Sequence, residues 1–170
     1  AASDVYKRQS MGSMFEGCSS LTGLDVSSFD TSNVTNMLQM FSDCSGLQSL
    51  NLGSDFDISS VELLGGGYTD GMFYCCSKLE AIIGSIKLGE QNAAKSMMHM
   101  FAGCAALESV VFETPESGAE FESLYSLNAM FEGCTSLKSV DLGNWILPNL
   151  TTAYEMFNYC TSLESVDLSW

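Results

Sequence analysis

The stretch MFEGCTSLKSVDL at residues 130–142 is nearly repeated as MFEGCSSLTGLDV at residues 14–26. Both fit the template MFxxCxxLxx[LVI], and four further copies of it begin at Met40, Met72, Met100 and Met156. The six template methionines, with Met14 and Met130 included, are separated by 26, 32, 28, 30 and 26 residues. Self-similarity at this period is typical of stacked repeats, in which each repeat forms one coil of a solenoid.

Each copy has two halves with different apolar spacing. An apolar residue lies three positions before the template Met in four copies, at Met11, Met37, Met97 and Leu127. Together with the template Met and Phe, it gives the spacing i, i+3, i+4, which predicts a short α or 3₁₀ segment. In the second half apolar and polar residues alternate, as at Leu24 and Val26, which predicts a short strand. Such strands must pair with neighbouring copies.

The two ends of the sequence are interpreted separately from the repeats. Residues 1–9, AASDVYKRQ, fit no repeat and are interpreted as a sequencing scar. Residues 10–170 are expected to form a single unit of about six coils, truncated at both ends. Because uncapped coils expose core edges, end-to-end self-association is expected.

The composition excludes some classes of partner. Six Lys and Arg residues against 21 Asp and Glu residues give a net charge of −15. This charge repels phosphate backbones, so nucleic acid is not expected as a partner. No run approaches the roughly 18 consecutive apolar residues of a membrane-spanning helix, so no span is expected in these residues.

The stretch LTGLDVSSFDTSNVTNMLQMFSDCSGL, residues 21–47, resembles the BspA-like leucine-rich repeats of bacterial surface proteins, and the resemblance extends over about residues 11–170. It implies an α/β repeat solenoid, a right-handed coil with short parallel strands on one face and short helical segments on the other. It also implies an extracellular or cell-surface location and recognition of, or adhesion to, a protein or glycan. It implies no catalytic residue and no cofactor. A spacer that displays another domain and has no ligand of its own is the alternative.

Six of the seven cysteines occupy one template position. They are Cys18, Cys44, Cys76, Cys104, Cys134 and Cys160. A repeated position of this kind favours a buried structural ladder, since free Cys is among the most buried residue types. A metal site is not expected, because His99 is the only His and no CxxC pair occurs. A disulfide between neighbouring copies stays open, and Cys75, outside the ladder, is the thiol expected to react if any does.

Catalytic motifs are not apparent. A nucleophilic dyad of His99 and Cys104 is disfavoured, because His99 sits at a template position with no fixed chemistry and is expected to be a solvated side chain. The chain has no GxSxG elbow and no GxxxxGK[ST] phosphate loop. This part of the protein is therefore predicted not to be an enzyme.

The predicted strand face offers the candidate binding residues. The middle strand residues should point outward, in the column Asp25, Asn51, Ile83, Val111, Asp141 and Asp167. We hypothesise that Ile83 and Val111 form an apolar spot bordered by Glu80, Glu108 and Asp141, which binds a partner presenting an apolar group beside a cation. The alternative is that the acidic columns only keep the protein soluble.

Calcium is the one metal that the loops suggest. Asp30, Asp55 and Asp57 lie in Ser- and Asn-rich connections, where stacked carboxylates could hold a cation. No calcium-loop motif accompanies them, so solvated turns are the favoured interpretation.

Overall fold

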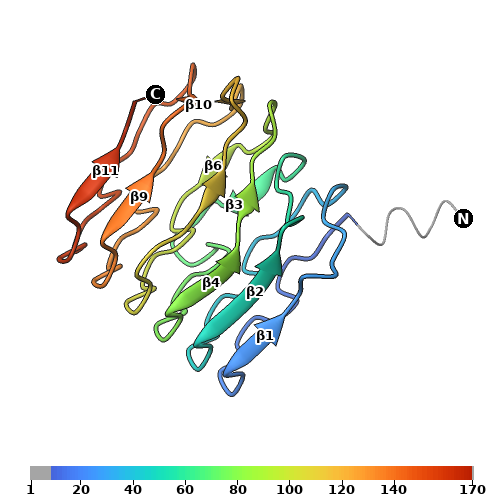
Figure 1. Ribbon diagram of the computed structural model, residues 1–170, viewed down its shortest axis with the longest axis vertical. Coiled ribbons are helices and arrows are strands. Elements are labelled where there is room, and N and C mark those ends of the chain that lie inside the picture. The colour runs from blue at the N-terminus through green and yellow to red at the C-terminus, as the bar shows by residue number, and fades with distance from the viewer. Residues whose placement is uncertain (1–8, 170) are drawn as a thin grey trace, which may run out of the picture.

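The computed structural model describes residues 9–169, and successive repeats lie side by side as stacked turns of the chain (Figure 1). The strands are β1 Gly23–Asp25, β2 Ser49–Gly53, β3 Leu63–Gly65, β4 Ala81–Gly84, β5 Ile86–Lys87, β6 Ser96–Met97, β7 Phe112–Glu113, β8 Ala119–Glu120, β9 Ser139–Asp141, β10 Trp145–Ile146 and β11 Ser165–Asp167. Within residues 9–169 there is no helix, and therefore none long and apolar enough to cross a membrane. The interpretation of residues 1–9 as a scar falls almost wholly outside the described residues.

All strand pairs are parallel and join one repeat to a later one. β1, β2 and β4 form a three-stranded sheet, and the pairs β3–β6, β5–β7, β8–β10 and β9–β11 form four two-stranded sheets. In the larger sheet Leu24 is opposite Leu50, and Leu50 is opposite Ile82, so identical template positions are aligned. Residues 109–111, at the equivalent place in the fourth copy, form no strand. The strand side is therefore interrupted there.

The predicted fold class, a leucine-rich-repeat-like α/β solenoid with helical segments on one face, is wrong. The described residues contain no helix, and their strands are divided among five small sheets instead of forming one continuous face. The segments expected to be helical are successions of tight turns.

Backbone hydrogen bonding explains why the template segment is not helical. The N–H of Ser42 donates to the carbonyl of Gln39 at 3.1 Å, which closes a turn within the segment. The N–H of Phe41 instead donates to Met72 of the next copy at 2.9 Å, and Asp43 also donates to that copy. A helix would direct every N–H to a carbonyl four residues earlier in the same segment. Here alternate N–H groups bond to the next repeat instead.

Left-handed residues at two template positions enforce this geometry. The residue before the template Met and the residue three after it have positive φ in most copies. They are Ser13, Gln39, His99, Ala129 and Glu155 at the first position, and Gly17, Asp43, Cys75, Gly103, Gly133 and Tyr159 at the second. A left-handed residue every four positions is incompatible with a right-handed helix. The spacing i, i+3, i+4 is therefore produced by consecutive turns.

A column of stacked phenylalanine rings forms the centre of the core under these turns. Its members are Phe15, Phe41, Phe73, Phe101, Phe131 and Phe157, with successive ring centroids 4.8 to 5.6 Å apart and ring planes within 2° to 11° of parallel. The four central rings are completely buried. Stacked aromatic pairs contribute beyond the burial of their area. This column holds neighbouring repeats at a regular spacing.

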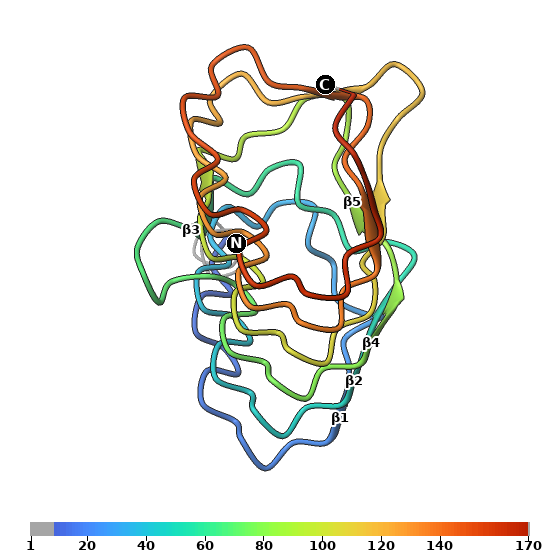
Figure 2. The same ribbon diagram turned by 90° about the vertical axis from the view of Figure 1, so that its left-hand side faces the viewer.

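Insertions account for the uneven repeat length. The N–H of Val26 in the first repeat donates to the carbonyl of Asn51 in the second. The equivalent residue of the third repeat is Gly84, but there the N–H of Ile86, two residues later, donates to the carbonyl of Val111 at 2.9 Å. Gly84 and Ser85 are thus two extra residues at the end of β4. A larger insertion forms the loop of residues 66–70, which projects on the side of β3, away from β1, β2 and β4 (Figure 2).

Candidate functional site

The predicted patch on the strand side consists of exposed residues in different local structures. Ile83 lies in β4 and is 55% exposed, whereas Val111 lies outside any strand and is 57% exposed. Glu80, Glu108 and Asp141 are exposed as well. All five predicted residues are therefore available to solvent.

The structure does not place Ile83 and Val111 opposite each other in one sheet. Ile83 is opposite Asn51 of β2, and the carbonyl of Val111 accepts its hydrogen bond from Ile86, beyond the two-residue insertion. Glu108 is paired with Lys138 of the next copy, whose Nζ lies 2.6 Å from Oε2. The border of the patch therefore includes a cation, Lys138, beside the predicted carboxylates.

The acidic column beside this patch has a structural role. The side chains of Asp25, Asn51, Asp141 and Asp167 each accept a hydrogen bond from the N–H two residues later, at 2.8 to 3.0 Å. Such Asx turns end a strand by replacing a backbone partner. Hydrogen bonds from Ser27 and Ser169 lower the pKa of Asp25 and of Asp167, respectively. Ile83 and Val111 cannot make this bond.

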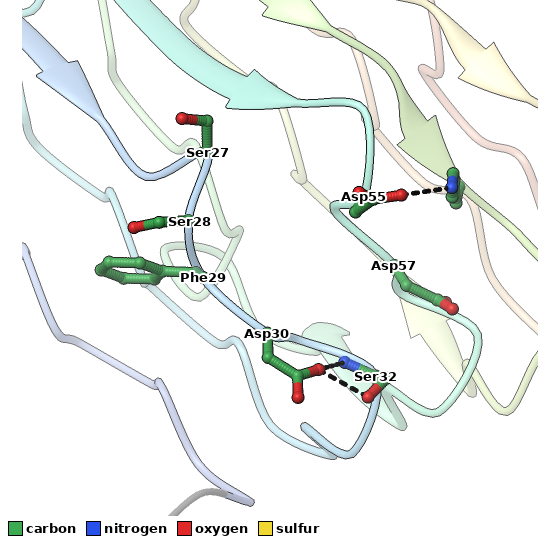
Figure 3. A pocket seen from close by; sticks show the side chains of 8 residues that line it. Ser27, Ser28, Phe29, Asp30, Ser32, Asp55 and Asp57 are labelled. Atoms are coloured by element: carbon green, nitrogen blue, oxygen red, sulfur yellow. Dashed lines mark hydrogen bonds and ion pairs between the residues drawn. The ribbon is translucent and has the colours of Figure 1, made fainter.

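An open pocket of about 400 Å³ lies between the connections of the first and second repeats (Figure 3). Its polar residues include Asp30, Asp55, Asp57 and Lys87, and the half-buried Phe29 also lines it. The Nζ of Lys87 lies 2.8 Å from a carboxylate oxygen of Asp55, and its hydrogen bond lowers the pKa of Asp55. Lysine therefore already supplies a positive charge within the pocket.

The other two carboxylates considered for calcium act in turns. Asp30 accepts hydrogen bonds from the N–H of Ser32 at 3.2 Å and from its hydroxyl at 2.6 Å. Asp57 accepts a hydrogen bond from the N–H of Ser59 at 2.7 Å. Within residues 9–169 no three His, Cys, Asp or Glu side chains are grouped to hold a metal ion. Asp30 and Asp57 thus each accept a hydrogen bond from the N–H two residues later in their own turn.

The ladder cysteines connect consecutive repeats. The thiols of Cys44, Cys76, Cys104, Cys134 and Cys160 each donate to the carbonyl of the template Phe in the preceding copy, at 3.0 to 3.1 Å. All seven cysteines are free, and burial raises the pKa of Cys44 to about 11. Burial also raises the pKa of Cys75, although a hydrogen bond with Tyr74 opposes the shift. Since the thiolate is the reactive form, this pKa disfavours reaction at Cys75.

The expectation that His99 is solvated is wrong. His99 is only 7% exposed, and its Nδ1 lies 3.1 Å from the carbonyl oxygen of Gly67 in the inserted loop. Its Nε2 lies 3.9 Å from Oε2 of Glu132. The rings of Tyr68 and Tyr74 lie 5.8 and 6.4 Å from the imidazole ring. Position 99 is variable among the copies, so the repeat pattern gave no indication of this environment.

A tyrosine-bearing surface on the turn side was missed from the sequence. Tyr68 is 84% exposed, and Tyr154 and Tyr159 are each 68% exposed. The repeat register contained a signal for it, because Tyr154 and Tyr159 flank the template Met and Phe without replacing either of them. A helix would place the side chains of Tyr154 and Tyr159 differently around the segment, so the predicted helix did not indicate that both lie on this surface.

Comparisons with known proteins identify a family for the chain. Its family model, described as "Mycoplasma protein of unknown function, DUF285", matches residues 2–113 and 72–170. No curated protein and no solved structure matches the chain. The family match supports a surface repeat-type protein, the coarser part of the predicted resemblance, and gives no support to leucine-rich repeats. Because the two matched segments together span nearly the whole sequence, the chain belongs to the DUF285 family.

Proposed function

We propose that the chain is part of a BspA-like protein, displayed on or secreted from a cell, and that it is a non-enzymatic module for recognition or adhesion. Its ligand is a protein or glycan that contacts the strand side. The observation that supports this proposal is the exposure of Ile83 and Val111, at 55% and 57%, within an acidic surface. Contiguous exposed apolar patches bordered by polar groups are typical of interaction sites.

The charges around these two residues suggest what the ligand presents. Glu80 is exposed, and Glu108 forms an exposed ion pair with Lys138. Exposed ion pairs contribute only about 0 to 1 kcal/mol, so a ligand can displace this one at low cost. A ligand with an apolar group beside a cation would cover Ile83 or Val111 and pair with the released carboxylate.

A spacer without a ligand of its own is the second proposal. The observation in its favour is that Asp25, Asn51, Asp141 and Asp167 use a side-chain oxygen to bond to their own backbone. Four of the six positions in the outward column thereby serve architecture. Under this proposal the strand side only maintains the length and solubility of the chain.

A binding screen with matched variants distinguishes the two proposals. The folded protein is tested against immobilised extracellular-matrix proteins and glycans, with calcium and with a chelator. Saturable binding that is lost in Ile83→Ser and Val111→Ser supports recognition on the strand side. Ile146→Ser is the control, because Ile146 is also an exposed aliphatic residue, at 45%, but lies in β10. Absence of binding by well-folded protein contradicts recognition and supports the spacer.

A further inference from the structure

The tyrosines are concentrated on the side of the molecule opposite the large sheet. We define the turn face as the two residues before each template Met, the second and third residues after it, and the loop of residues 66–69. Tyr68, Tyr74, Tyr154 and Tyr159 belong to this face. The projecting loop and β3 lie on one side of the molecule, and β1, β2 and β4 lie on the other (Figure 2).

The copies of this face are aligned by backbone hydrogen bonds. The N–H of the third residue after the template Met donates to the carbonyl of the second residue in the next copy, at 2.7 to 2.8 Å. This bond occurs from Gly17 to Ser42, Asp43 to Tyr74, Cys75 to Ala102, Gly103 to Glu132 and Gly133 to Asn158. The side chains of the turn face are thus held at a regular spacing.

The charge of the turn face has a single sign. Its carboxylates are Glu16, Asp43, Asp70, Glu132 and Glu155. Among residues 9–169, none of the positions that define the face is Lys or Arg. Lys87, Lys95 and Lys138 form ion pairs elsewhere, with Asp55, Glu62 and Glu108. The turn face therefore combines negative charge with exposed aromatic rings.

His99 connects the loop to the face. Its Nδ1 lies 3.1 Å from the carbonyl oxygen of Gly67, and its ring lies 5.8 Å from that of Tyr68. His99 itself is buried, with Glu132 and Tyr74 as further neighbours. Tyr68 is 84% exposed, so its ring is open to a partner.

We propose that the turn face binds an arginine- or lysine-bearing segment of a basic protein partner. Cations are attracted to the faces of tyrosine rings and to carboxylates, and the turn face supplies both groups. Nucleic acids and anionic glycans are repelled by the same charges. This site is independent of the proposed strand-side function and lies on the opposite side of the molecule.

The test uses a short synthetic peptide of alternating arginine and glycine, titrated into the full chain by calorimetry. Salt at about 150 mM screens the attraction between any polycation and a protein of net charge −15. Tyr68→Ala and Tyr154→Ala leave the net charge unchanged. Each is expected to weaken binding roughly fivefold, the effect of losing one cation–π contact. The same peptide with citrulline in place of arginine is expected not to bind.

A charge-matched pair of double variants separates the turn face from non-specific attraction. Glu132→Gln with Glu155→Gln removes two charges from the turn face. Glu80→Gln with Glu164→Gln, which share one template position in the third and sixth copies, removes two from the strand side. The proposal predicts weaker binding for the first pair and less than about a twofold change for the second. Equal losses in the two pairs, unaffected binding in the tyrosine variants, or no binding of the arginine peptide would each overturn it. Circular dichroism confirms that every variant is folded.

Discussion

The strand side and the turn side of this protein differ in regularity. On the strand side β1, β2 and β4 are separated from β9 and β11 by residues 109–111, which form no strand. On the turn side the hydrogen bonds between repeats continue without a break from Gly17 to Asn158. At the insertion of residues 66–70 the N–H of Met72 donates to Leu64, whereas the N–H of every other template Met donates to the residue three before it. The bonds from Phe73 and Cys75 to the fourth copy are nevertheless retained. The template MFxxC, and not the strand, is therefore the element that keeps the repeats in register.

The largest expected effect comes from breaking the phenylalanine column on the turn side. Phe101 is completely buried between Phe73 and Phe131, so Phe101→Ala should lower the free energy of unfolding by about 3 to 5 kcal/mol. Tyr154→Ala, at an exposed position, should change it by less than about 0.5 kcal/mol. Urea denaturation followed by fluorescence measures both. Similar values for the two variants would mean that the column does not organise the turn side.

A smaller effect is expected from the left-handed positions of the turns. Gly133 has φ of 71°, and an added Cβ would meet nothing closer than 3.8 Å, so Gly133→Ala tests conformation alone. It should destabilise the protein by about 1 kcal/mol, because alanine rarely adopts this conformation.

The converse change tests the same position in another copy. Asp43 has φ of 57°, a conformation that glycine adopts at a lower free-energy cost than aspartate. Asp43→Gly should therefore be neutral or raise the free energy of unfolding by a few tenths of a kcal/mol. Thermal unfolding measures both variants. Stabilisation by Gly133→Ala would contradict the assigned turns.

The smallest effect concerns the Asx turns of the strand side. The pKa of Asp25 is lowered, mainly by hydrogen bonds from Ser27, so this carboxylate stabilises the folded state above the unfolded pKa of 3.8. The contribution is lost as the pH falls through the lower folded pKa. Asp25→Asn keeps the acceptor oxygen and removes the titration, so its stability should depend less on pH between about pH 5 and pH 3. An identical acid-unfolding profile for the variant and the original protein would refute this role for Asp25.

The repeat unit could be predicted from the sequence, but the local structure of its first half could not. The spacing of Met37, Met40 and Phe41 fits a helix and a series of tight turns equally well. The deciding feature is the positive φ of Gln39 and Asp43, which cannot be inferred from the identity of either residue. Only Gly17, Gly103 and Gly133, at one of the two left-handed positions, hinted at it.

For the candidate sites, the surface positions could be predicted from the sequence, but the contacts of the side chains could not. Alternation in the second half of each copy placed Ile83 and Val111 on the surface, where both are exposed. The ion pair of Glu108 with Lys138 depended on side-chain geometry that spacing does not contain. The contact of His99 with the inserted loop joins Gly67 to a position 32 residues away. No periodic pattern encodes such a contact, because it occurs in one repeat only.

The most direct test of the account is a hydrogen-bond scalar coupling measured by nuclear magnetic resonance in the isotope-labelled protein. The N–H of Phe101 donates to the carbonyl of Met130 in the next repeat at 2.8 Å. We expect a coupling between the amide nitrogen of Phe101 and the carbonyl carbon of Met130. A coupling from Phe101 to Met97, four residues earlier, would show a helix in the template segment and would contradict the account.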